Sequence, residues 1–200
     1  MRRIALIMAG LALIEAGCVN VNVGGKPAAP LPLMTLTPAT GMPVDAGHVL
    51  NADSAVRIDA PLSPSPINVT RIPVYGSDGS ISYVRGAFWT DPPATLFRAL
   101  LGEVVVAHTG RAVLDPRVTS ARAGTVLGGT LLRFGIDEAG HQAVVTFDAI
   151  LTRNGQGTFT RRFEARAPVA AINGTNSAAA LNDAANQVAA QVADWIKATP

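Results

Sequence analysis

Residues 143–152, Ala-Val-Val-Thr-Phe-Asp-Ala-Ile-Leu-Thr, decide the fold of this chain. Apolar side chains occupy every second position from Ala143, which is the two-residue period of a strand with one buried face. Similar stretches lie on either side, at 126–136 and 158–167, and turn residues 137–140 and 154–157 separate the three. The spacing therefore predicts three consecutive antiparallel strands.

Shorter strands are expected in the chain before these three. The stretches 54–59 and 69–74 are rich in β-branched residues. Asp78-Gly79 is a typical hairpin turn, and it leads into a strand at 81–89. A short strand at 111–114 completes this set.

Two amphipathic helices are also expected. Asp91-Pro92-Pro93 favours a helix start, and an apolar stripe through Phe97 and Leu101 continues to about His108. The second helix spans 177–198. Both stripes need a sheet to cover them, so we predict an α+β domain with a mostly antiparallel sheet and two helices packed on one face.

Composition limits the function classes. The 200 residues are 48% apolar and 15% charged, which is enough for the core of one domain. The net charge of only +2 gives no nucleic-acid footprint. We therefore expect a folded domain that does not bind nucleic acid.

The first residues form an export signal. Arg2 and Arg3 precede the uncharged apolar run 4–14, which is too short to span a bilayer comfortably. The run is followed by Ala16-Gly17-Cys18, and Cys18 is the only cysteine. We expect residues 1–17 to be a lipoprotein signal peptide.

Ala16-Gly17-Cys18 resembles a bacterial lipobox, in which the cysteine thiol takes a diacylglycerol. Acyl chains such as palmitate would then anchor the protein, because two or three chains hold stably where one does not. Glu15 stands where the motif usually has an apolar residue, and an ordinary signal peptide with an incidental cysteine is the alternative. Val19 is not the aspartate that retains lipoproteins at the inner membrane, so a periplasmic position at the outer membrane is favoured.

Residues 18–50 are expected to be a tether. They hold five prolines between 27 and 43, and such linkers are semi-extended spacers. The apolar and threonine-rich piece 33–37 allows an edge strand within the tether. The folded domain is expected to cover 51–198.

No combination of residues indicates catalysis. His48, His108 and His141 fall in a linker, a helix end and a turn, and none has a second ligand at metal spacing. The stretch 76–80 lacks the spacing of a nucleophile elbow, and 124–130 lacks the lysine of a phosphate loop. We predict a protein that is not an enzyme and has no cofactor or metal.

The domain resembles the ABC-type transport auxiliary lipoproteins, the family that includes paraquat-inducible protein C and the auxiliary component of MCE (mammalian-cell-entry) lipid transporters. The order of several stretches carries the resemblance between about 33 and 197. They are Leu33–Leu36, Val56–Pro61, Ile72–Tyr83, Phe88–Pro93, Thr130–Asp137 and Ala180–Ile196.

The resemblance implies a non-catalytic accessory role. The anchored domain would work with an ATPase, a permease and an MCE subunit that move lipid between the membranes and maintain the outer membrane. A free-standing envelope lipoprotein, acting in assembly or cell-wall binding, is the alternative. A homo-oligomer is compatible with either.

We expect the domain to bind a partner and not to carry lipid. Alternation along the last strands leaves the second sheet face polar, with Thr146, Asp148, Thr160 and Arg162 on it. Phe88 and Trp89 are the candidate partner-docking residues, because aromatic side chains dominate interface energetics.

Overall fold

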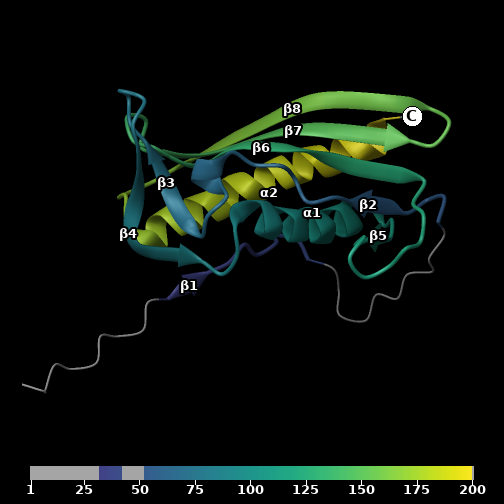
Figure 1. Ribbon diagram of the computed structural model, residues 1–200, viewed down its shortest axis with the longest axis horizontal. Helices are drawn as coiled ribbons and strands as arrows, with labels where there is room; N and C mark the ends of the chain where they lie inside the picture. The colour runs from purple at the N-terminus through teal and green to yellow at the C-terminus, as the bar shows by residue number, and fades with distance from the viewer. Residues whose placement is uncertain (1–31, 42–51, 200) are drawn as a thin grey trace, which may run out of the picture. The chain divides into compact units, whose positions relative to one another are not determined.

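The computed structural model describes residues 32–41 and 52–199 of the chain. The expected signal peptide, Cys18 and most of the expected tether lie outside these residues. The described elements, in chain order, are β1 (Leu33–Met34), β2 (Val56–Ile58), the 3-10 helix η1 (Ser65–Ile67), β3 (Arg71–Tyr75), β4 (Ile81–Trp89), α1 (Pro93–Thr109), β5 (Val113–Leu114), β6 (Thr125–Asp137), β7 (Gln142–Arg153), β8 (Gly157–Pro168) and α2 (Gly174–Ala198) (Figure 1).

The three long strands β6, β7 and β8 pair antiparallel in chain order, as their alternation predicted. Leu127, Leu151 and Phe159 are register neighbours across them, and so are Leu131, Phe147 and Phe163. These rows face the core, where Phe147 and Leu151 are fully buried. The alternation that predicted the strands therefore also identified their buried face.

The sheet as a whole is mixed, and the prediction of a mostly antiparallel sheet is wrong in this respect. β2 and β3 both run parallel to β6, β1 runs parallel to β4, and β2 runs parallel to β5. Parallel neighbours need a crossover connection, and α1 lies between β3 and β6 in the chain. Local alternation does not report these pairings, because they join segments far apart in the sequence.

One edge of β6 accommodates both short strands in turn. β2 pairs at Thr125–Leu127, Leu62 bridges to Thr130, and β3 pairs at Ile136–Asp137. The opposite edge of β6 is filled by β7 along its whole length. The long central strand therefore joins the N-terminal strands to β7 and β8 in one sheet.

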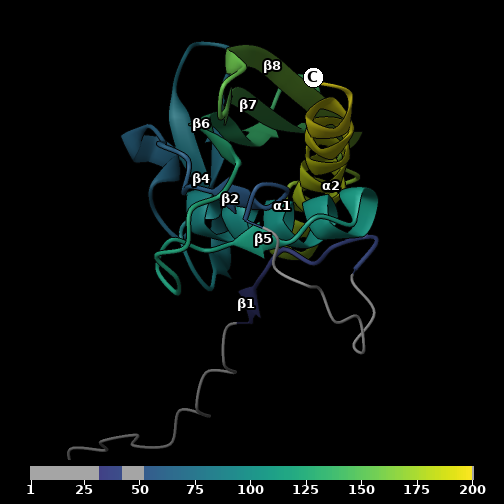
Figure 2. The same cartoon turned by 90° about the vertical axis from the view of Figure 1, so that its right-hand side faces the viewer.

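Both helices lie on the same face of this sheet, as predicted (Figures 1 and 2). Phe97 of α1 meets Phe147 of β7 edge to face, with ring centroids 5.3 Å apart. The Trp195 ring of α2 packs against the Phe163 ring of β8, with ring centroids 5.5 Å apart. Leu101 is fully buried between α1 and the sheet, so the apolar stripe of α1 faces the core.

Candidate interaction surfaces

The two candidate docking residues lie on opposite faces of β4. Trp89 is 1% exposed, and its ring meets Phe134 edge to face at 5.7 Å in the core. Its side chain is therefore not presented to a partner. Phe88 is half-buried and points to the other face, so it stays a candidate.

The face of the sheet opposite the helices is called the outer face here. Leu33, Phe88 and Arg71 are register neighbours on β1, β4 and β3, and they form a row across this face. Leu33 is 65% exposed, although it is a large apolar residue. An exposed leucine beside a half-buried phenylalanine is an apolar spot of the kind that partners cover.

Arginines stack on aromatic rings next to this spot. The Arg71 guanidinium lies 4.2 Å from the Tyr83 ring centroid, and that of Arg133 lies 4.6 Å from the Tyr75 ring centroid. Neither arginine forms an ion pair with a described carboxylate. Burial raises the pKa of the Tyr75 hydroxyl, so that ring stays neutral beneath its arginine. This part of the outer face is aromatic and positively charged.

The other half of the outer face, on β7 and β8, is polar as predicted, but its charges are paired. Arg162 donates to both carboxylate oxygens of Asp148, at 2.6 and 2.7 Å. This hydrogen bonding lowers the pKa of Asp148. Arg166 likewise pairs with Glu164 at 2.9 Å. Exposed pairs of this kind contribute little to stability, and they leave this half nearly neutral.

The expected edge strand at 33–37 is a strand only at β1, and the chain beyond it is held by side-chain amides of α2. Thr37 N–H donates to Asn182 Oδ1 at 2.8 Å, and Ala39 N–H donates to Asn186 Oδ1 at 2.7 Å. Asn186 Nδ2 returns a hydrogen bond to the Thr37 carbonyl at 2.9 Å. We call residues 32–41 the strap, because α2 binds their backbone as a neighbouring strand would.

The strap also packs against the body of the domain. Met34 carbonyl accepts a hydrogen bond from Thr90 N–H at 2.8 Å, and the Met34 side chain packs on the core. A Cβ at Gly174 would lie 3.1 Å from both the Met34 methyl and the Ala87 side chain. A side chain at Gly174 would therefore push on the strap, and Met34 would have to shift slightly to make room.

Sequence reasoning missed the role of Asn182 and Asn186. Their spacing of four residues places both amides on one face of α2, and this was the available signal. The signal is incomplete without the strap, because two asparagines on a helix are ordinarily solvated.

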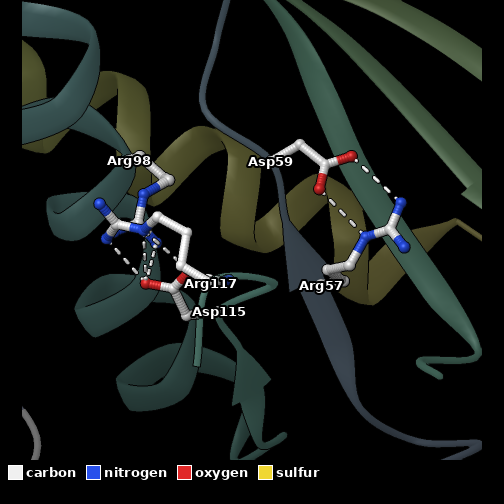
Figure 3. Close-up of polar contacts among 5 residues, drawn as sticks. All are labelled: Arg57, Asp59, Arg98, Asp115 and Arg117. Atoms are coloured by element: carbon white, nitrogen blue, oxygen red, sulfur yellow. Dashed lines mark hydrogen bonds and ion pairs between the residues drawn. The ribbon is translucent and has the colours of Figure 1, made fainter. Parts of the chain in front are cut away.

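Two further charge clusters have structural roles (Figure 3). Arg98 of α1 and Arg117 both reach Asp115, at 3.0 and 2.8 Å, and so fix the chain after β5 to the helix. The hydrogen bonds from Arg117 hold the pKa of Asp115 well below its usual range. Arg57 and Asp59 form a local pair at 3.0 Å on β2 and the residue that follows it.

The described residues contain no group of three or more His, Cys, Asp or Glu side chains arranged to hold a metal ion. No helix among the described residues is both long enough and apolar enough to cross a membrane.

The described residues form an α+β domain whose helices lie on one face of the sheet and whose outer face carries arginines beside aromatic rings. The chain belongs to the family of ABC-type transport auxiliary lipoprotein components, whose model matches residues 35–193. The family is a lipoprotein family, so the chain is associated with the cell envelope and with the components of a transporter. The resemblance found in the sequence is thereby confirmed.

Solved structures share the fold. Protein XCC0632 from Xanthomonas campestris is 22% identical with a TM-score of 0.61, and the match covers 82% of this chain and 90% of that one. An uncharacterized protein is 17% identical with a TM-score of 0.63, and the match covers 83% of this chain and 95% of that one. No curated protein matches the sequence.

Proposed function

We propose that this protein is a non-catalytic, lipid-anchored accessory component of an MCE-type system that moves lipid between the inner and outer membranes. It acts at the periplasmic face of the outer membrane and supports the integrity of that membrane. Membership of the transport auxiliary family carries the proposal.

The outer face supports a role through protein contacts. Its half on β1, β3 and β4 combines exposed Leu33 with half-buried Phe88. Arg71 and Arg133 lie beside them, and neither forms an ion pair with a carboxylate of the described residues. Aromatic residues and arginine are enriched where protein interfaces gain most of their binding energy. A partner with an acidic and apolar surface fits this half, and the MCE subunit or the permease is the proposed partner.

The strap supports the anchoring part of the proposal. A diacylglyceryl group on Cys18 would be joined to the domain through residues 19–31, and the strap follows directly. Because α2 and β4 bind the strap, a chain that leads from the anchor would first meet the folded domain there.

Fractionation of Cys18→Ser tests the anchor. The variant should move from the membrane fraction to the soluble periplasm, and the wild type should sediment with outer membranes. A variant that stays with the membranes at the wild-type level contradicts lipidation of Cys18.

Affinity purification tests the partner. The full chain, purified from its own cells in a mild detergent, should bring the ATPase, permease and MCE subunit of one transporter with it. Phe88→Ala should weaken this association, whereas Gln187→Ala, on the exposed face of α2, should not. Recovery of cell-wall or assembly proteins in their place would favour a free-standing envelope lipoprotein.

A further inference from the structure

We propose that the pocket formed by Arg111 and Arg153 binds a phosphate-type oxyanion. The pocket is lined by residues at the start of β6 and the end of β7. These strand ends lie near the C-terminal end of α2 (Figure 1). The volume of the pocket is about 320 Å³, and the residues around it are Asp53, Arg111, Gly124, Thr125, Arg153, Asn154 and Gln156. This site is separate from both the outer face and the strap.

Arg111 is held in place by the ends of two strands. Its Nε donates to the Ser54 carbonyl at 2.5 Å, and one terminal nitrogen donates to Thr125 Oγ1 at 2.7 Å. Thr125 is itself buried, so this contact fixes the plane of the guanidinium. The other terminal nitrogen of Arg111 makes no hydrogen bond to the described residues.

Arg153 approaches from the last residue of β7. One terminal nitrogen donates to the Ile196 carbonyl in the last turn of α2. Its Nε is buried and has no hydrogen-bond partner in the described part of the chain. A buried guanidinium N–H without an acceptor costs free energy. A small rotation of the Arg153 side chain would turn this N–H towards the pocket, where an oxyanion would supply the acceptor.

The two guanidinium groups repel each other across the pocket. Burial, and then the charge of Arg153, lower the pKa of Arg111. Neither arginine forms an ion pair with any carboxylate of residues 32–41 and 52–199. Asp53 also lines the pocket, so the formal charge of the lining is +1.

A tetrahedral oxyanion fits these donors. Guanidinium groups bind phosphate through paired N–H donors, and charge-assisted hydrogen bonds of this kind are the strong ones. The Asn154 and Gln156 side chains of the β7–β8 turn add neutral amide donors at the rim. A free phosphate and the phosphate of a lipid headgroup present the same chemistry to the pocket.

Both arginines also have structural contacts, so the test compares stabilisation by the anion and not stability alone. The full chain is purified in a non-ionic detergent and a phosphate-free buffer. Inorganic phosphate is then added at constant ionic strength, with chloride as the reference. Phosphate at ten times its Kd should raise Tm by roughly 3 °C or more.

Arg111→Gln and Arg153→Gln should each abolish this increase, whereas Arg85→Gln, an exposed arginine of β4, should keep it. The Nε–H resonance of Arg153 provides a second measurement on the wild type, and phosphate should shift it. This resonance decides the question even if a glutamine variant fails to fold.

Detergent micelles containing phosphatidylglycerol or phosphatidylcholine distinguish the two sources of the phosphate group. Stabilisation by inorganic phosphate indicates a free anion. Stabilisation by phosphatidylglycerol micelles but not by inorganic phosphate indicates a headgroup, provided that both glutamine variants lose it. If neither probe shifts Tm or the Arg153 resonance, or if the variants respond as the wild type does, the proposal is wrong.

Discussion

Replacing Asn186 by alanine should release the strap and leave the domain folded. The substitution removes the acceptor of Ala39 N–H and the donor to the Thr37 carbonyl. A hydrogen bond contributes about 1 kcal/mol net, so the two lost bonds favour opening of the strap by about 2 kcal/mol. Alanine is also the better helix former, by up to about 0.7 kcal/mol, and this offsets part of any loss in α2.

Amide hydrogen exchange measures this opening directly. The Thr37 amide is the reporter, because its acceptor Asn182 Oδ1 is kept in the variant. Since about 1.4 kcal/mol corresponds to a factor of ten, this amide should exchange roughly 30 times faster in Asn186→Ala. Amides of the core strand β7 should keep their protection, since they do not depend on the strap.

Gln187→Ala is the matched control, because Gln187 is the next residue of α2 and is exposed. It should leave the exchange of the Thr37 amide unchanged. If Asn186→Ala leaves it unchanged too, then α2 does not hold the strap and the reasoning is refuted. A fall in protection throughout β7 would show that the substitution unfolds the whole domain.

Three more predictions concern the fold. Leu101→Ala should lower the free energy of unfolding by about 2–5 kcal/mol in denaturant titrations, whereas the 85% exposed Val118 should tolerate alanine within about 0.5 kcal/mol. Gly129→Ala should prevent stable folding, because φ is +139° there and a Cβ would lie 2.0 Å from a backbone oxygen of β7; Gly128→Ala, with open space around its Cβ, should fold and melt near the wild type. Asp115→Asn should lower Tm at neutral pH. The native pKa of Asp115 lies below its usual 3.8, so its contribution to stability is present above about pH 4 and is lost on further acidification. The difference in Tm between the wild type and Asp115→Asn should therefore shrink below about pH 4. A difference in Tm that stays constant with pH would contradict this.

The sequence predicted the elements of this fold better than their pairing. Alternation through Val145, Phe147 and Leu151 located β7 and its buried face, because a half-buried strand repeats every two residues. The parallel pairing of β2 and β3 with β6 has no such local signal. It depends on a crossover through α1 and on the length of β6, which only the assembled sheet reveals.

The interaction surfaces were predictable only in part. The sequence predicted Phe88 and Trp89 as docking residues because both are aromatic. Adjacent strand residues point to opposite faces, however, and only Phe88 lies on the outer face. The pocket brings together Arg111 and Arg153, which are 42 positions apart in the sequence. Nothing near either arginine in the chain indicates the other.

Site-specific photocrosslinking in intact cells tests the central claim most directly. A crosslinking residue at Leu33 or Phe88 probes the outer face, and one at Gln187 probes the exposed side of α2. If the protein is a transport accessory that acts through its outer face, the first two positions should crosslink to a permease or MCE subunit and Gln187 should not. Crosslinks to no transporter subunit from Leu33 and Phe88, or equal crosslinks from all three positions, would contradict the account.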